Sequence, residues 1–389
     1  MIERAIDDLM ALLPIAGPPG GERAVADYLA GQLAAAGVPR STIAHDSAQD
    51  QSEYGGEVGN LIVRFEGRRP GPRRMFSTHM DTVPDAVGCK PRLERQAGRI
   101  VNDAKGSALG GDNRLGCAIL LALARRLVEL DGDHVPVTLV FFIQEEVGLV
   151  GARGLDLSKL GDPKPALCVN LDGGPVEDVV TAVTGTERFT IDIKGIPAHA
   201  GRPAGGLSAA MIAAAALTEL QDGGWHGVIE KDESRGSANV GTMNGGQGSN
   251  VVMPSMSILA EARSHDPAFR SEIIRTWRAA FEGAAARAEN DEGARGSVVF
   301  GPGPTYEAFA LSDDEPVVRM TLEAARHVGF EMRTVTNNGG MDANWIVAHG
   351  IPAITIPVGQ RQVHTADEWI DLVDFEKACR VVVRLGEVH

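Results

Sequence analysis

Short apolar runs alternate with helix-patterned segments through the first half of this 389-residue chain. Val135 to Ile143 and Ala166 to Leu171 are almost wholly apolar and of strand length, which is typical of strands buried on both faces. Between other such runs, Arg114 to Leu130 is rich in alanine and leucine and predicts a long helix, with Asp112 or Asn113 placed to cap it. Strands that alternate with helices predict an α/β fold around a mostly parallel sheet.

The pattern changes after about residue 182. Phe189, Ile191 and Ile193 alternate with polar residues, which predicts a strand with one solvent-exposed face. The segments that follow give the order β-α-β-β-α-β, which is typical of a ferredoxin-like α+β unit. Alternation of helices and strands resumes near residue 310. We therefore expect an α/β domain formed by residues 1–182 and 309–389, with a smaller α+β domain inserted at residues 183–308.

Composition and charge exclude several classes of protein. The formal net charge of −15 repels phosphate backbones, so nucleic acid is an improbable partner. No apolar run reaches the roughly 18 residues of a membrane-spanning helix, and no signal peptide is visible, so we expect a cytoplasmic protein without membrane contact. The cysteines are widely spaced and predict neither a disulfide framework nor a zinc ribbon; they are Cys89, Cys117, Cys168 and Cys379.

Side chains that can bind metal follow several of the predicted strands. They are His79 and Asp81, Glu145 and Glu146, Asp172 and the late His364, with Asp112 at the start of the long helix. In an open α/β sheet, ligands bind outside the carboxyl ends of the strands, so these side chains are expected at one edge. Two imidazoles and several carboxylates suit Zn²⁺, Mn²⁺ or Co²⁺, and the cysteine positions exclude a thiolate site.

Each of these motifs has a simpler interpretation when taken alone. Asp112 could be only a helix cap, His79 a buried structural histidine and His364 a surface histidine. The pair Glu145 and Glu146 is harder to explain, because adjacent carboxylates repel each other unless a cation or a shared proton relieves them. Their common position at one sheet edge favours a metal centre.

Taken together, these motifs resemble those of a known family. His79-Met80-Asp81-Thr82-Val83-Pro84, Gly111-Asp112-Asn113, Glu145-Glu146-Val147-Gly148, Asp172-Gly173-Gly174 and His364 are similar in order and spacing to the motifs of the M20 metallopeptidases. Within that family, Gly339-Gly340-Met341-Asp342-Ala343-Asn344 resembles the peptidase T-like, or tripeptide aminopeptidase, branch. Met341 departs from the small polar residue that many relatives have there, so substrate preference does not transfer directly.

The resemblance implies two divalent metal ions per subunit, with zinc as the first choice and manganese or cobalt as alternatives. Asp112 would bridge the two ions, while the other ligands would be His79 and Asp172 for one ion and Glu146 and His364 for the other. Asp81 would orient the His79 imidazole, and Glu145 would be the general base. Similar enzymes also have a cis peptide bond at the position of Asp112–Asn113.

The inserted domain resembles the lid of these enzymes. In that comparison His199 would stabilise the developing oxyanion, Asn250 and Arg263 would bind a substrate carboxylate, and Gly340 would bring its backbone close to the substrate. The residues alone leave open that His199 is a plain loop histidine and that Arg263 forms a surface salt bridge. In relatives the lid often mediates a homodimer, and the sequence does not decide whether His199 serves its own chain.

We therefore expect a metal-dependent peptidase of the aminotripeptidase type, acting on short peptides. The first alternative is a carboxypeptidase or an N-acyl amino acid deacylase of the same superfamily. A catalytically inactive peptide-binding relative is the second alternative, and the presence of Glu145 and of all five implied ligands argues against it.

Overall fold

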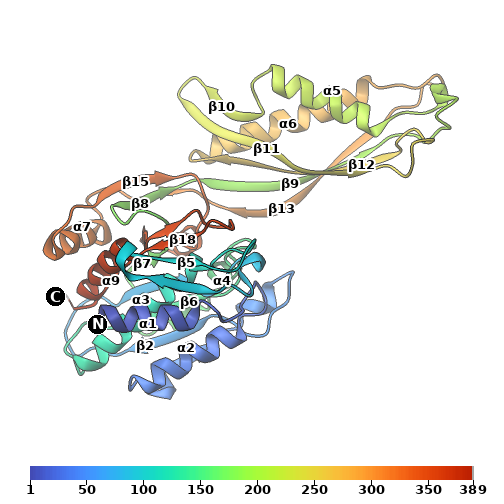
Figure 1. The fold of residues 1–389 in the computed structure, drawn as a ribbon. Helices are drawn as coiled ribbons and strands as arrows, with labels where there is room; N and C mark the ends of the chain where they lie inside the picture. Colours follow the sequence, from blue (N-terminus) through green and yellow to red (C-terminus); the bar gives the residue numbers. More distant parts are fainter. Residues whose placement is uncertain (388–389) are drawn as a thin grey trace. The chain divides into compact units, whose positions relative to one another are not determined.

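The computed structural model describes residues 1–387, and these divide into two compact units (Figure 1). The large unit comprises Met1–Ala182, Ala310–Asn337 and the described chain from Met341 onward. The small unit comprises Val183–Phe309 and Asn338–Gly340. Each unit has its own cluster of buried apolar side chains, as expected for two separately packed domains.

A nine-stranded sheet forms the centre of the large unit. Its strand order is β1 (Ile43–His45), β2 (Leu61–Phe65), β6 (Val137–Phe142), β3 (Arg74–His79), β7 (Leu167–Leu171), β16 (Ala353–Ile356), β8 (Asp178–Val183) and β14 (Phe309–Ala310), and β15 (Arg333–Asn337) pairs with β8. The four strands β6, β3, β7 and β16 run parallel to one another. All residues of these four strands are buried, which explains why their sequences do not alternate. The predicted mixed α/β fold with a mostly parallel central sheet is confirmed.

Helices cover this sheet. They are α1 (Ile2–Leu12), α2 (Arg23–Ala35), α3 (Gly111–Glu129), α4 (Val150–Arg153), α7 (Pro316–Val328), α8 (Ala343–Ala348) and α9 (Leu372–Glu387). Helix α3 packs on β3, and α1, α2 and α9 pack against α3. Because neighbours surround it, α3 is buried on nearly all sides, which its small and aliphatic residues allow.

The start of α3 departs from regular helix. Asp112 and Asn113 have non-helical backbone angles, and the peptide bond between them is cis, as the family resemblance implied. The side chain of Asn113 then caps the regular part, because its Oδ1 accepts a hydrogen bond from Gly116 N at 3.1 Å. Of the two expected capping residues, Asn113 has this role, and Asp112 remains free for another one.

A second, four-stranded sheet belongs to the large unit, with the order β17 (Gln360–Arg361), β18 (Trp369–Asp371), β5 (Arg99–Asn102) and β4 (Pro91–Glu94). The small unit is a five-stranded sheet in the order β10 (Gly227–Lys231), β11 (Ser234–Gly245), β12 (Ser255–Ser264), β9 (Gly185–Lys194) and β13 (Ser297–Tyr306). Helices α5 (Ala209–Asp222) and α6 (Pro267–Arg287) pack on this sheet (Figure 1). Strand β10 is an addition to the expected β-α-β-β-α-β order, and it forms a hairpin with β11.

Two further expectations concern the cysteines and membrane-spanning helices. All four cysteines are buried and free, so they pack as small apolar side chains. Among residues 1–387, no helix combines the length and apolarity that crossing a membrane requires.

Candidate metal centre

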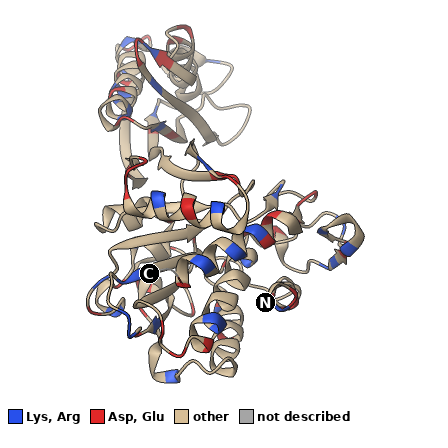
Figure 2. Cartoon of the chain, turned by 90° about the vertical axis from the view of Figure 1, so that its left-hand side faces the viewer, with Lys and Arg blue, Asp and Glu red and all other residues tan. Residues whose placement is uncertain are grey.

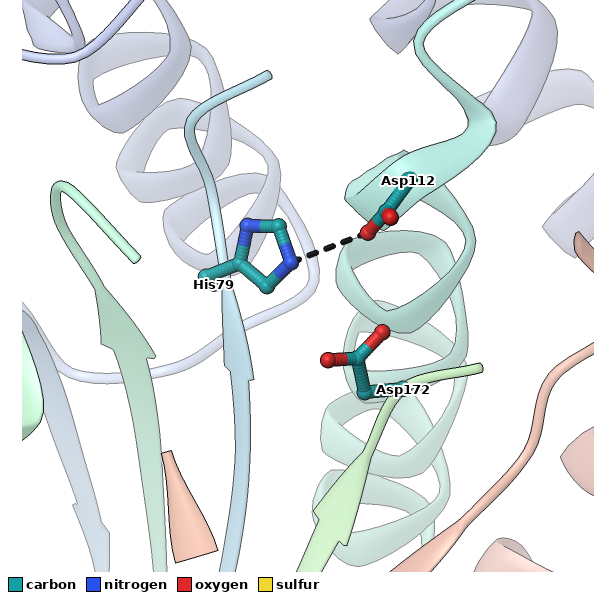
Figure 3. Close-up of side chains that lie close together, drawn as sticks. All are labelled: His79, Asp112 and Asp172. Atoms are coloured by element: carbon teal, nitrogen blue, oxygen red, sulfur yellow. Dashed lines mark hydrogen bonds and ion pairs between the residues drawn. The ribbon is translucent and has the colours of Figure 1, made fainter. Parts of the chain in front are cut away.

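Three of the parallel strands deliver candidate ligands to one edge of the large sheet, and a helix and a loop supply the other two. His79 is the last residue of β3, Asp172 follows β7, and Glu146 lies in the loop after β6. Asp112 comes from the start of α3 (Figure 3). His364 lies in the loop between β17 and β18, in the left-handed region with a φ of 62°.

The candidate ligand atoms form three groups: one consists of His79, Glu145 and Glu146, and the other two share Asp112. Of those two, His79, Asp112 and Asp172 make one, and Asp112, Glu146 and His364 make the other; within each group the ligand atoms lie within 4.8 Å of one another. His79 Nε2 is 3.0 Å from Asp112 Oδ1 (Figure 3), and His364 Nε2 is 3.3 Å from Asp112 Oδ2. His364 Nε2 is also 3.0 Å from Glu146 Oε1. The two oxygens of Asp112 therefore face two different histidines.

The electrostatics of this cluster favour bound cations. Burial, reinforced by Asp112, raises the pKa of Asp172 to about 7, and burial also raises the pKa of Glu146. Burial raises the pKa of Glu145 well above its usual value, and the neighbouring carboxyls of Asp342 and Asp172 add to this. These buried carboxyls repel one another when they are all ionised, and a bound divalent cation would remove that repulsion. Oxygen and imidazole donors also match the ligand sets of Zn²⁺, Mn²⁺ and Co²⁺, so the residues present fit such ions.

Opposite pKa shifts occur where the histidines meet the carboxylates. Hydrogen bonds to Asp112 and Glu146 raise the pKa of His364 to about 10. Burial alone would raise the pKa of Asp112, but hydrogen bonds from His364 and His79 hold it below its usual range. Each histidine thus shares a proton with a carboxylate, and a bound cation would take the place of that proton.

Asp81 contacts both His79 and the loop that carries Glu145 and Glu146. Its carboxylate lies 3.4 Å from His79 Nδ1, and the same ring nitrogen is 3.1 Å from the main-chain oxygen of Asp81. Asp81 also accepts hydrogen bonds from the backbone amides of Glu145 at 3.0 Å and Glu146 at 3.2 Å. One fully buried carboxylate therefore fixes both the imidazole and the loop that carries the adjacent glutamates.

Sequence reasoning missed Gln360 and Glu368. Gln360 donates from Nε2 to Asp112 Oδ1 at 3.2 Å and accepts from Gly173 N at 2.8 Å, so it links two candidate ligand segments. Glu368 accepts from the amides of Leu109, Gly110 and Asp112, which fixes the turn before α3. The only local signal was that Gln360 follows the buried strand β16, as the other site residues follow theirs.

Glu22 and Gln144 form a third support that the sequence did not indicate. Glu22 is fully buried, and its Oε1 accepts from Gln144 N at 3.1 Å and from Gly20 N at 2.9 Å. Gln144 has a φ of 50°, a conformation that needs such support in a residue with a side chain. Gln144 immediately precedes Glu145, so Glu22 helps to set the backbone from which that side chain projects.

The sequence of this chain matches that of a known protein family. Residues 75–387 match the model of peptidase family M20/M25/M40. The chain belongs to this family. The predicted M20 membership is thereby confirmed, and the chain is a peptidase of a metal-dependent family.

Three relatives cover almost the whole chain. The uncharacterized protein YqjE of Bacillus subtilis is 30% identical over 99% of this chain and 98% of its own length. A tripeptidase of Staphylococcus aureus has a TM-score of 0.86 and 27% identity, covering 100% of this chain and 98% of that one. Aminopeptidase PepT of Bacillus cereus has a TM-score of 0.82 and 29% identity, also covering 100% and 98%. The peptidase T-like resemblance is therefore confirmed.

Within this M20 peptidase, His199 and Asn250 lie in neighbouring segments of the small unit. Both residues are exposed, and Ala200 N donates to Asn250 O at 2.9 Å. His199 Nδ1 accepts a hydrogen bond from Gly201 N at 3.0 Å. An Nδ1 that accepts carries no proton in the neutral ring, so the N–H is on Nε2 and is available as a donor.

Arg263 of the small unit already has an anionic partner. Its Nε is 2.8 Å from Glu261 Oε1, and its second terminal nitrogen donates to Glu261 Oε2 at 3.3 Å. Arg188, from the adjacent strand β9, also approaches Glu261, at 3.6 Å. Two guanidinium groups thus share one carboxylate, which leaves a net positive charge at this place.

Gly340 is needed for a reason that the sequence did not reveal. A Cβ at this position would lie 2.2 Å from the hydroxyl oxygen of Tyr306. That hydroxyl also accepts a hydrogen bond from Thr186 at 3.0 Å. The close approach of Gly340 is therefore to Tyr306 in the structure.

Proposed function

We propose that this M20 peptidase is an aminopeptidase that removes the first residue of short peptides, tripeptides above all. The single observation that carries the proposal is the pair of ligand groups sharing Asp112 at the edge of the large sheet. The tripeptidase and the aminopeptidase that align over the whole chain support the choice of substrate end.

His79, Asp112 and Asp172 would hold one divalent ion, and Asp112, Glu146 and His364 would hold the second. When bound, such a pair supplies Lewis-acid chemistry, polarising a carbonyl oxygen and lowering the pKa of water. Zinc is the proposed metal, with manganese and cobalt as alternatives. Asp81 would orient His79 through its main-chain oxygen and its carboxylate.

Glu145 would act as the general base. It would take the proton of the attacking water onto its carboxylate and pass it to the leaving amine. Its backbone amide is held by Asp81 at 3.0 Å, and the preceding residue is held by Glu22 at 3.1 Å. A base fixed in this way loses little entropy when substrate binds, which supports its assignment.

The small unit would supply the remaining groups. His199 would donate from Nε2 to the developing oxyanion, consistent with its Nδ1 being an acceptor in the resting protein. Arg263 and Asn250 would bind the carboxylate at the far end of the peptide, with the extra charge of Arg188 beside Glu261 favouring an anion. Gly340 would present backbone to the same end of the substrate.

Residues 183–308 would then serve as a lid over the substrate and as the contact surface of a homodimer. We further propose that the enzyme works in the cytoplasm on small peptides, with neither nucleic acid nor membrane as a partner. The net charge of −15 supports the exclusion of nucleic acid.

A cleavage assay read by mass spectrometry tests the function directly. Chelator-treated protein would be reloaded with Zn²⁺, Mn²⁺ or Co²⁺ and given one tripeptide in three forms: free at both ends, N-acetylated and C-amidated. We expect metal-dependent loss of the first residue, and none from the acetylated form. Loss of the last residue or of the acetyl group would assign a carboxypeptidase or a deacylase, and no cleavage with any metal would contradict the peptidase proposal.

A further inference from the structure

A cavity of about 540 Å³ opens among α1, α3, α7 and α9 of the large unit. This volume lies within the range of sites that hold small organic molecules. Five arginines line it against two glutamates: Arg4, Arg125, Arg126, Arg380 and Arg384, with Glu129 and Glu387. In a chain of net charge −15, this is an unusual local excess of positive charge, and Figure 2 shows blue segments recurring on the helices beside the two marked termini.

Acidic neighbours pair with four of these five arginines. Arg125 pairs with Asp8, Arg126 with Glu129 and Glu387, and Arg380 with Glu376, while Arg4 approaches the same Asp8 at 3.6 Å. Arg384 is half-buried, and its side chain makes no hydrogen bond or ion pair with any residue in the range 1–387. Its guanidinium therefore keeps its donors for a group that the chain does not provide.

A second arginine lies beside Arg384. Arg380 and Arg384 are four residues apart on α9, so they lie on the same face and repel each other. Attraction to the negative end of the α9 dipole accounts for a cation in the last turn, but it gives the guanidinium N–H groups no acceptor side chain among residues 1–387. A bound anion would satisfy those donors and remove the repulsion.

The remaining lining indicates what else such an anion carries. Ala122, Val328 and Val383 contribute apolar surface, and the exposed His327 adds a polar group at the side. A planar guanidinium fork matches the paired oxygens of a phosphate group, and the apolar surface suits an organic body attached to it. We propose that this arginine-lined cavity binds a small phosphorylated organic molecule.

This site is distinct from the metal centre. Arg126 follows Asp112 by fourteen residues along α3, which corresponds to about 20 Å at the rise of a helix. The two sites thus lie near opposite ends of one helix. Occupation of the cavity does not require the metal ligands, so its binding can be measured separately from catalysis.

Isothermal titration of the metal-loaded protein with ADP tests the proposal. We expect saturable binding that weakens about tenfold or more in Arg380→Ala/Arg384→Ala, since each lost charge-assisted contact is a substantial part of such an affinity. Arg384→Lys should also bind more weakly than wild type, because a lysine cannot form the fork. The matched control is Arg319→Ala, which removes an exposed arginine without a partner among residues 1–387 from α7 outside the cavity, and it should bind like wild type.

Several results would overturn the proposal. They are the absence of ADP binding, binding that persists in the double variant and so resides at the metal centre, and an equal loss of binding in Arg319→Ala. Citrate or adenosine binding as tightly as ADP would refute the choice of a phosphorylated ligand. If the double variant fails to fold, as judged by thermal unfolding, Arg384→Gln replaces it with the same expected loss.

Discussion

The metal centre of the large unit and the proposed substrate residues of the small unit differ in how firmly the chain holds them. At the centre, His79 and Asp81 are almost completely buried, and each has partners from neighbouring loops. In the small unit, His199 and Asn250 are exposed, and their contacts are mainly with nearby backbone. The chain itself preorganises the centre, whereas under the proposed function the exposed groups would gain further partners when substrate binds. Variants of the centre should therefore change metal content or turnover, and variants of the small unit should leave the metal in place.

Asp112→Ala should have the largest effect. Both ligand groups contain Asp112, so its loss removes a donor from each, and both ions should be lost with all measurable peptidase activity. Elemental analysis of the dialysed protein measures the metal content. As a control, Asp8→Ala removes a buried carboxylate of the same unit that pairs with Arg125, and it should retain two ions. Retention of both ions by Asp112→Ala would refute the shared-ligand assignment.

Glu145→Gln should lower kcat by about 10²- to 10⁴-fold, the usual contribution of a general base, while two ions stay bound. The amide cannot take up the proton of the attacking water. Steady-state kinetics on a free tripeptide, together with elemental analysis, separates this outcome from metal loss. Substantial residual activity would mean that another residue is the base. Asp342 would be examined next, because it is buried beside Glu145 and its Oδ1 has no hydrogen-bond partner among residues 1–387.

His199→Ala should lower kcat by about 10²- to 10³-fold, as expected for the loss of one oxyanion donor, without changing metal content. A parallel loss of metal would break the contrast between the two units. Mixing this variant with Glu145→Gln sharpens the test. Activity that reappears in the mixture shows that His199 acts on the partner chain of a dimer, and inactivity of the mixture assigns it to its own chain.

Glu22→Ala should lower kcat by about 10- to 100-fold, the usual cost of removing a residue that supports a metal site from behind. It accepts from the amide of Gln144, which has a left-handed backbone and precedes the proposed base. Glu22→Gln keeps an acceptor oxygen and should restore most of the activity. Equal losses in the two variants would argue against this positioning role.

The raised pKa of Glu22 also predicts how the stability of the protein depends on pH. Burial, with Asp81 adding to it, raises the pKa of Glu22 from 4.5 to about 7. The folded chain thus binds this proton more tightly than the unfolded chain, so the stability that the group contributes is full below pH 4.5 and is lost as the pH rises through about 7. In chelator-treated protein, the thermal midpoint of Glu22→Gln relative to wild type should therefore rise between about pH 5 and pH 8. A constant difference would contradict the raised pKa.

The sequence predicted those parts of the site that depend on local pattern. A short apolar run indicates a buried parallel strand, and the direction of the chain shows which end of the strand is its carboxyl end. His79, Glu146 and Asp172 could therefore be assigned to one edge of the sheet. Helix α3 and a cap at Asp112 or Asn113 follow from the same kind of signal, and the structure assigns the cap to Asn113. These features need only a few consecutive residues.

The supporting groups could not be predicted, because they come from distant segments. Glu368 lies more than 250 residues after the turn that it fixes, and Gln360 joins two ligand loops without any motif of its own. Glu22 looks like the first turn of an ordinary helix. Only the folded chain shows that their carboxylate or amide groups end beside backbone donors, since no pattern along the sequence specifies such a pairing.

Arg263→Ala should have the smallest effect, and one confined to substrate binding. We expect KM to rise about tenfold for a tripeptide with a free carboxylate, with kcat nearly unchanged, because one charge-assisted contact is lost. Glu261 already pairs with Arg263 and is shared with Arg188, so Arg188→Ala is the matched variant and should show a weaker change in the same direction. The C-amidated tripeptide is the control: it lacks the charge that the arginine would bind, and its KM should not depend on Arg263. An equal rise for both peptides would show that Arg263 is needed only to hold Glu261 and β12, and the small unit would then have no carboxylate-binding role at this position.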